Sequence, residues 1–243
     1  MTISAEILVI RKDDQFSGQL RSGGFRVQNL PLIETVPIDD VPSLRAAVKD
    51  LESYDGIFIT SRVAAEVFVN TWIHGHQRPE VYVVGSRAAE ILQAAGWPVS
   101  IGNDANTAAE LLGSLGLARL AGKRFLFVRG DKSLNRIPAM LDGIAELDHV
   151  VVYRTVDHPL EKEILNDIRG WLEQRSFDWI CFFSPSAVER FVDVFGDVAA
   201  PKAAVIGRTT AARARDLGLD VRFVSHTSSA SSFASGLIKH IDG

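Results

Sequence analysis

Small, hydroxyl-bearing and basic residues follow several apolar runs of the sequence. In an open parallel sheet such turns meet at one edge, where the N-termini of the following helices present unpaired amide hydrogens. Together they would suit a ligand that carries several carboxylates or phosphates. The same residue types cap helices and permit turns in any protein, so for one turn alone the structural explanation is the better one. The residues concerned are Arg11, Thr60-Ser61-Arg62, Gly85-Ser86-Arg87, Arg129-Gly130, Ser184-Pro185-Ser186 and Gly207-Arg208-Thr209-Thr210.

Tyr153 is the candidate proton donor. It ends the apolar run Val150–Val152 and precedes Arg154, at a point where the chain is expected to leave one lobe for another. A reference pKa of about 10 keeps a phenol protonated at neutral pH, so it can donate a hydrogen bond or a proton to a leaving oxygen. The alternative interpretation is an aromatic residue half-buried at a strand end, with its hydroxyl in water.

Other common chemistries have little support. His74 and His76 lie two residues apart in a polar stretch, and such residues do not share a helix face, which favours a loop over a metal pair. Cys181 is the single cysteine and lies in an apolar run, which predicts packing rather than nucleophilic chemistry. Neither Gly85 nor Gly207 begins a G-x-G-x-x-G sequence. These residues therefore give little support to a metal site or to a bound nucleotide.

Alternating strands and helices must position these turns. Short apolar runs typical of buried parallel strands alternate with helical patterns, which predicts an α/β fold. The predicted strands are Ile7–Ile10, Val27–Ile33, Gly56–Ile59, Val81–Val84, Phe125–Val128, Val150–Tyr153, Ile180–Phe183, Ala203–Ile206 and Val221–Val224. The predicted helices are Ala64–Asn70, Ala88–Ala95, Ala187–Phe195, Thr210–Leu217 and a last amphipathic helix that contains Phe233, Leu237 and Ile241 and is capped within the serine-rich stretch Ser228–Ser235.

An internal repeat relates the two halves of the chain. One shift of the sequence places Ser61 on Ser184, and an almost identical shift places Gly85 on Gly207. The period is far too long for a solenoid and fits a duplicated domain. We infer two similar lobes, each a parallel sheet flanked by helices in a flavodoxin-like arrangement. The other identical pairs include Asp55 and Asp178, Ile57 and Ile180, Ala64 and Ala187, Glu66 and Glu189, and Phe68 and Phe191.

The composition excludes several classes of function. With 243 residues, 47% of them hydrophobic, the chain can bury one large core or two ordinary ones. Lys and Arg number 26 against 30 Asp and Glu, and the basic residues are scattered, so a nucleic-acid partner is not expected. The apolar runs are much shorter than the roughly 20 residues that cross a bilayer, and the first residues lack a secretory signal. We expect a cytoplasmic protein without membrane association.

The order and spacing of these pieces resemble those of the uroporphyrinogen-III synthase (HemD) family over essentially the whole chain. No single piece is specific, but their order and the tyrosine between the halves are. The sequence departs from the family pattern at Lys12, where a proline often follows the first arginine, and at Ala88, where a threonine is frequent. The matching segments are Leu8-Val9-Ile10-Arg11, Ile57-Phe58-Ile59-Thr60-Ser61, Val84-Gly85-Ser86, Val128-Arg129-Gly130, Val151-Val152-Tyr153-Arg154-Thr155, Phe183-Ser184-Pro185-Ser186-Ala187-Val188 and Ile206-Gly207-Arg208-Thr209-Thr210-Ala211.

The resemblance implies a cofactor-independent lyase of porphyrin and haem biosynthesis. Such an enzyme cyclises hydroxymethylbilane to uroporphyrinogen III, inverting ring D and releasing water. It also implies two α/β lobes, with residues 1–35 and 158–243 in lobe 1 and residues 38–155 in lobe 2. The two proline-bearing connectors near residues 34–43 and 154–160 are expected to be extended.

The resemblance also implies roles for individual residues. By motif position Tyr153 would assist loss of the hydroxymethyl oxygen, while turn amides and hydroxyls would hold the substrate carboxylates in a cleft between the lobes. A monomer that takes its substrate from hydroxymethylbilane synthase is expected. The expected substrate-binding residues are Arg11, Thr60, Ser61, Arg62, Gly85, Ser86, Arg129, Ser184, Ser186, Gly207, Thr209 and Thr210.

Two other classes of function stay open at this point. A two-lobed, non-catalytic protein that binds a tetrapyrrole or another anion would show the same turns, as would an enzyme acting on a sugar or nucleotide phosphate. Supplying hydroxymethylbilane and resolving the porphyrin isomers of the oxidised product separates these classes from a synthase.

Overall fold

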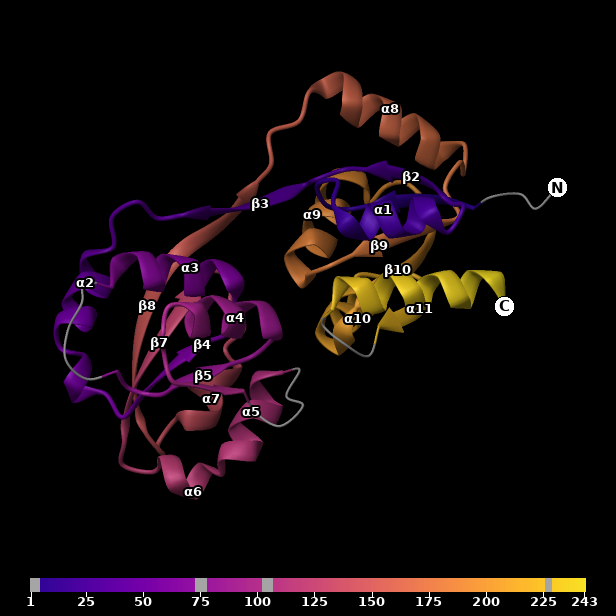
Figure 1. Cartoon of the computed structure of the whole chain (residues 1–243). Coiled ribbons are helices and arrows are strands. Elements are labelled where there is room, and N and C mark those ends of the chain that lie inside the picture. Colours follow the sequence, from indigo (N-terminus) through magenta and orange to yellow (C-terminus); the bar gives the residue numbers. More distant parts are fainter. Residues whose placement is uncertain (1–4, 73–77, 102–106, 226–228) are drawn as a thin grey trace. The chain divides into compact units, whose positions relative to one another are not determined.

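Two compact units make up the chain. The computed structural model describes residues 5–72, 78–101, 107–225 and 229–243 (Figure 1). Unit 1 combines Met1–Glu34 with Val156–Gly243, and unit 2 is Thr35–Thr155. Because unit 1 draws on both ends of the chain, a division at the centre of the internal repeat would cut through the fold.

Unit 1 contains a five-stranded parallel sheet with the order β11-β10-β9-β1-β2. Ile7 on β1 aligns with Trp179 on β9, so strands far apart in sequence form the centre of the sheet. Its strands are β1 (Glu6–Val9), β2 (Arg26–Asn29), β9 (Trp179–Phe182), β10 (Lys202–Ile206) and β11 (Val221–Ser225). Its helices are α1 (Gln15–Ser22), α8 (Lys162–Glu173), α9 (Pro185–Phe195), α10 (Gly207–Asp216) and α11 (Ala230–Asp242).

Helices cover both faces of the unit 1 sheet. Leu8 faces the cluster that contains Phe191 of α9, whereas Ile7 faces the cluster that contains Phe16 of α1 and Phe233 of α11. This alternation along β1 follows from the two-residue period of a strand, which sends neighbouring side chains to opposite faces. A strand buried on both faces reads as a continuous apolar run, which is why β1 was predictable from the sequence.

Unit 2 contains a six-stranded sheet with the order β3-β8-β7-β4-β5-β6, in which β8, β7, β4, β5 and β6 are parallel. Ile57 and Phe58 of β4 again face different clusters. Its strands are β3 (Ile33–Pro37), β4 (Gly56–Ile59), β5 (Val81–Val83), β6 (Val99–Ile101), β7 (Arg124–Gly130) and β8 (Glu146–Asp157). Its helices are α2 (Pro42–Lys49), the 3-10 turn η1 (Leu51–Ser53), α3 (Arg62–Thr71), α4 (Ser86–Ala94), α5 (Ala108–Leu115), α6 (Leu117–Leu120) and α7 (Arg136–Leu141).

The chain passes between the units within β3 and β8, which are neighbours in the sheet. The Ile38 N–H donates to the Val152 carbonyl over 2.9 Å, and the His158 N–H donates to the Leu32 carbonyl over 3.0 Å. Sequence numbers rise on one strand as they fall on the other, as antiparallel pairing requires. Both passages are therefore extended and hydrogen-bonded to each other.

The α/β prediction is confirmed, but several element boundaries differ. The predicted strand Val27–Ile33 is two strands of different sheets, because β2 ends at Asn29 and β3 begins only at Ile33, after the buried Leu30 and Leu32. The segment near residues 34–43 is not extended throughout, since α2 begins at Pro42, and proline is favourable in the first turn of a helix. The last helix begins at Ala230, and the Ser229 Oγ accepts the Ser232 N–H over 3.4 Å.

Several elements were not predicted from the sequence. β6 has three residues at a sheet edge and is only partly buried, so it lacks the apolar run that marks the central strands. α8 was not predicted, although Ile164, Leu165, Ile168 and Leu172 recur at helical spacing and Ile168 and Leu172 are buried. His74 and His76 lie outside the described residues. Among the residues that are described, no helix combines the length and apolarity needed to cross a membrane.

Candidate active site

The carboxyl edge of the unit 2 sheet collects the candidate residues of that unit. Gly130 ends β7, and Tyr153 of β8 is its register partner. Thr60 follows β4 and Gly85 follows β5. Because these four strands are adjacent and parallel, the residues that follow them lie along one edge. The predicted turns of unit 2 are thus brought together by the sheet.

Tyr153 is held in place by its own unit. Its ring lies over Gly130 so closely that a Cβ added there would be 2.3 Å from both Cε2 and Cζ of the ring. The side chain is half-buried and packs against the cluster that contains Val150 and Val152. Within the described parts of the chain, no hydrogen bond joins its hydroxyl to another residue. The ring is therefore fixed while its hydroxyl remains available to a ligand.

The carboxyl edge of unit 1 carries the related turns of the second half. Arg11 follows β1, Ser184 follows β9, and Gly207 follows β10. These strands are adjacent and parallel, so the three turns share an edge. Ser186 lies in the first turn of α9, with its Oγ 3.2 Å from that of Ser184. The internal repeat therefore places equivalent turns at equivalent edges of the two sheets.

Two of the predicted hydroxyls already cap helices. The Ser61 Oγ accepts the Ala64 N–H over 3.1 Å at the start of α3, and the Ser184 Oγ accepts the Ala187 N–H over 3.2 Å at the start of α9. Such caps satisfy one of the unpaired amides of a helix N-terminus. A hydroxyl keeps a donor and a second lone pair when it caps, so each serine can still bind a carboxylate. Thr60, directly before Ser61, is half-buried.

The two glycine turns leave their helix N-termini without a side-chain cap. Gly85 has φ +89° before α4, and Gly207 has φ +72° at the start of α10, a region that disfavours other residues. The first-turn amides of both helices therefore point outward toward any anion that approaches. Ser86 is exposed and Thr209 is half-exposed at these starts, whereas Thr210 is buried, with 4% of its surface exposed.

The predicted arginines are anchored by neighbours within their own units. The Arg11 guanidinium pairs with the Asp14 carboxylate at 2.7 Å and stacks 4.3 Å from the centre of the Phe183 ring. Arg62 pairs with Glu66 one turn along α3. The third, Arg129, donates from Nη2 to the Ser133 carbonyl over 2.7 Å and from Nε to the Gly130 carbonyl over 3.1 Å. These contacts hold the cations close to the turns.

Ionisable groups with shifted pKa values lie away from these turns or beside the passages between units. Hydrogen bonds from His158 and Lys12 lower the pKa of Glu34 on β3. Burial, and then the hydrogen bond to Asp148, raise the pKa of Tyr54 to about 12. Complete burial raises the pKa of the Cys181 thiol, which makes a nucleophilic role for it untenable.

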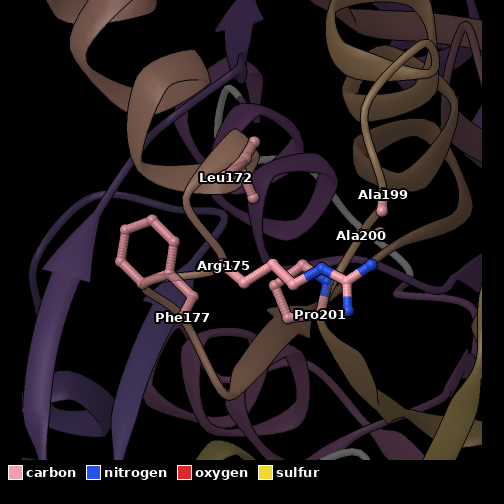
Figure 2. Close-up of a pocket in the computed structure, with 6 residues that line it drawn as sticks. All are labelled: Leu172, Arg175, Phe177, Ala199, Ala200 and Pro201. Atoms are coloured by element: carbon pink, nitrogen blue, oxygen red, sulfur yellow. The ribbon is translucent and has the colours of Figure 1, made fainter.

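Cavities at other positions do not involve the predicted residues. One of about 260 Å³ is lined by Leu172, Arg175 and Phe177 together with residues 199–201, and Figure 2 shows the Arg175 side chain reaching toward Ala199 and Ala200. These residues precede β9 and β10, so the cavity lies at the amino ends of the strands, opposite the candidate turns. Across the described residues, His, Cys, Asp and Glu nowhere gather in threes that would hold a metal ion.

A family model described as uroporphyrinogen-III synthase HemD matches residues 14–235 of this chain. The chain belongs to this family. The uroporphyrinogen-III synthase of Chlorobaculum parvum (strain DSM 263 / NCIMB 8327) is 27% identical over 248 residues, which cover 95% of this chain and 97% of that protein. As a member of the family, the chain is an enzyme, a cyclising lyase of tetrapyrrole biosynthesis, and a non-catalytic binding role is not favoured.

Solved structures of the family share the fold. A mutant uroporphyrinogen III synthase from the extremely thermophilic bacterium Thermus thermophilus matches with a TM-score of 0.66 and 20% identity, over 98% of this chain and 99% of that one. The uroporphyrinogen-III synthetase from Helicobacter pylori 26695 matches with a TM-score of 0.61 and 16% identity, over 97% and 99%. At these identities the matches establish the architecture of the chain, and the site residues must be argued from the geometry above.

Sequence reasoning missed the residues that support Tyr153. Gly130 was named only as part of a turn, and neither Asp131 nor Ser133 was singled out. The Gly130 N–H donates to the Ser133 Oγ over 3.0 Å, and the Asp131 N–H donates to the Tyr153 carbonyl over 3.1 Å. The tetrapeptide Gly-Asp-Lys-Ser after an apolar run signals a turn, but nothing in it indicates which strand the turn will support.

Proposed function

We propose that this member of the family converts hydroxymethylbilane to uroporphyrinogen III, with Tyr153 as the acid that assists loss of the hydroxyl group. The observation that carries the proposal is the Tyr153 phenol, fixed over Gly130 at the carboxyl edge of the unit 2 sheet with its hydroxyl available. A family match across most of the chain supports it.

The substrate supplies most of the reactivity in this reaction. The pyrrole nitrogen lone pair expels the hydroxymethyl oxygen and leaves an azafulvene cation, while a proton donated to that oxygen completes the water that departs. A phenol with a reference pKa of about 10 is protonated at neutral pH and can make this donation. The substituted carbon of ring D then attacks the cation to form a spiro intermediate, which rearranges to the inverted ring and loses one proton to give the neutral product.

Geometry is the larger part of the enzyme's task, because the linear substrate can close without help to the wrong isomer. Holding ring D so that only the substituted carbon reaches the cation lowers the barrier by orientation. Substrate carboxylates would be held by amides and hydroxyls at the carboxyl edges of both sheets. The set proposed for this role is Arg11, Thr60, Ser61, Arg62, Gly85, Ser86, Arg129, Ser184, Ser186, Gly207, Thr209 and Thr210.

The site attracts an anionic substrate through local groups. The net charge of the chain is −4, so its overall charge opposes binding of a polycarboxylate. The uncapped N-termini of α4 and α10 and the anchored guanidinium of Arg11 provide positive potential where the turns lie. Thr210 would act through the N-terminus of α10, since its side chain is buried. A cytoplasmic location, a monomeric state and direct transfer of substrate from hydroxymethylbilane synthase stay predictions of the sequence.

The test is turnover of freshly generated hydroxymethylbilane by Tyr153→Phe, with the oxidised porphyrin isomers resolved. Removing only the hydroxyl should lower the rate roughly tenfold to a thousandfold and leave folding intact. Tyr82→Phe is the matched control, since the Tyr82 ring packs against Phe58 and Phe125 inside unit 2. Unchanged turnover in Tyr153→Phe would remove the tyrosine from the mechanism. Formation of isomer I alone by the wild-type chain would refute the synthase function.

A further inference from the structure

The strand that carries Tyr153 has a local irregularity at that residue. Arg129 of β7 pairs with Val151, and the next residue, Gly130, pairs with Tyr153, so Val152 is an extra residue on β8. Such a bulge interrupts the alternation of side chains between the two faces of the sheet, so the side chain of the following residue points to a different face than regular pairing would give. Consistent with this, Val152 and Tyr153 are consecutive and yet both pack against the same core cluster.

Asp131 makes hydrogen bonds to β8 just after this bulge, on either side of Arg154. Its backbone N–H donates to the Tyr153 carbonyl over 3.1 Å, and its Oδ1 accepts the Thr155 N–H over 2.9 Å. The same Oδ1 accepts the Lys132 N–H over 2.7 Å, which holds the carboxylate in the turn after β7. A charged acceptor makes these bonds stronger than a neutral one would. The backbone of β8 is thereby pinned to the turn just beyond the bulge.

The same turn fixes the surface beneath the ring. Ser133 accepts the Gly130 N–H with its Oγ over 3.0 Å, and its carbonyl accepts a hydrogen bond of 2.7 Å from the Arg129 guanidinium. Gly130 is thus held directly under the Tyr153 ring, where a Cβ would overlap it. Asp131 therefore links the bulge on β8 to the end of β7. The distance between these two segments determines where the phenol lies.

We propose that Asp131 is a positioning residue for Tyr153, whose carboxylate holds the β8 bulge in register so that the phenol lies over Gly130. This inference deepens the proposed function and rests on it for its kinetic consequences. Its structural part, the location of the Tyr153 ring, can be tested without any activity. No ligand contact is assigned to Asp131.

Removing the carboxylate should act on the rate far more than on substrate binding. A displacement of about 1 Å at a reacting group can lower the rate about a hundredfold. We expect Asp131→Ala to lower kcat about tenfold to a hundredfold and to change KM less than about threefold. Asp131→Asn keeps an acceptor oxygen for the Thr155 N–H, so its kcat should stay within about threefold of the wild-type value.

The opposite end of β7 supplies a matched control. There Asp55 makes a similar pair of bonds, both to Arg124: its N–H donates to the Arg124 carbonyl over 2.8 Å, and its Oδ2 accepts the Arg124 N–H over 2.9 Å. Asp55→Ala removes an equivalent carboxylate from the same unit but from the amino end of the strand. Its kcat should be unchanged, and an equal loss in both alanine variants would show that Asp131 is merely structural.

A double-mutant cycle decides whether Asp131 acts through the phenol. If it does, Asp131→Ala should change kcat less than about twofold in a Tyr153→Phe background, because the group that it positions is already gone. Multiplicative losses in the double variant would overturn the proposal.

Fluorine NMR of the chain labelled with 3-fluorotyrosine provides the readout that does not depend on activity. The chain has three tyrosines, so Tyr153→Phe assigns the resonance of interest. We expect that resonance to shift or broaden in Asp131→Ala and to stay in place in Asp131→Asn and Asp55→Ala. An unmoved resonance in folded Asp131→Ala would refute the proposal, even if the wild-type chain produced no uroporphyrinogen III. If Asp131→Ala does not fold, Asp131→Ser carries the same expectations and the same refuting result.

Discussion

Replacing Gly130 by alanine should displace the Tyr153 phenol, since the two residues touch across β7 and β8. A Cβ on Gly130 would be 2.3 Å from Cε2 and Cζ of the ring and 2.7 Å from its hydroxyl oxygen. Carbon atoms in ordinary contact are about 3.5–4.0 Å apart. The ring must therefore move by more than about 1 Å, or the two strands must separate. The backbone itself presents no obstacle, because φ of Gly130 is not positive.

The size of the effect follows from that displacement. A reacting group misplaced by about 1 Å can lose about a hundredfold in rate, so we expect kcat to fall about thirtyfold to a hundredfold. The turns proposed to hold the substrate carry no substitution, and KM should stay within about threefold. Inserting a methyl group into this packed contact should lower the free energy of unfolding by about 1–3 kcal/mol.

Steady-state kinetics on freshly generated hydroxymethylbilane, with the oxidised isomers resolved, measures the loss. The fraction of isomer I should rise, because unaided closure then competes with the enzyme. Gly113→Ala is the control: it lies in α5, and an added Cβ would meet nothing within 4 Å. That variant should keep full activity and gain roughly 0.5–1 kcal/mol of stability. A folded Gly130→Ala chain with wild-type kcat would show that the position of the phenol does not matter.

Three further predictions concern other parts of the chain. Ser61→Ala should lower the free energy of unfolding by about 1 kcal/mol, and Ser61→Gly by only a few tenths, as measured by urea denaturation. If KM rises equally in both variants, the Ser61 hydroxyl binds the substrate. If KM is unchanged in both, the hydroxyl only caps α3. The pKa of Tyr54 is raised to about 12, so the folded state keeps this proton while the unfolded state loses it near pH 10. Stability should fall as pH rises from 10 to 12, and urea midpoints should show a smaller fall in Tyr54→Phe, in which only Tyr82, whose pKa is also raised by burial, remains of the two. Cys181 is fully buried and its pKa is raised, so a thiol reagent should modify it only in denaturant, and fast modification of the native chain would contradict its burial.

Much of the fold could be predicted from the sequence because the patterns that indicate strands and helices are local. Central strands such as β4 and β9 are buried on both faces and therefore appear as short apolar runs. Because of the internal repeat, elements of the second half could be predicted from those of the first. Ser184 was expected at the start of a helix because it is equivalent to Ser61, and both serines cap a helix. The edge strand β6 lacked such a signal, since it is short and only partly buried. α8 does carry apolar residues at helical spacing, Ile164, Leu165, Ile168 and Leu172, but the sequence analysis did not use that pattern.

Residue types and their order were enough to predict the α/β class, the hydroxyl and glycine turns after the strands, and Tyr153 as the candidate acid. These depend on residues within a few positions of one another, where propensity and capping act. The tertiary structure was needed to show that the phenol lies over Gly130, that β8 bulges at Val152 and that Asp131 holds the bulge. Those facts depend on the register between β7 and β8, whose paired residues are more than twenty positions apart in sequence. That register is set by the packing of both strand faces as a whole, and no single residue determines it.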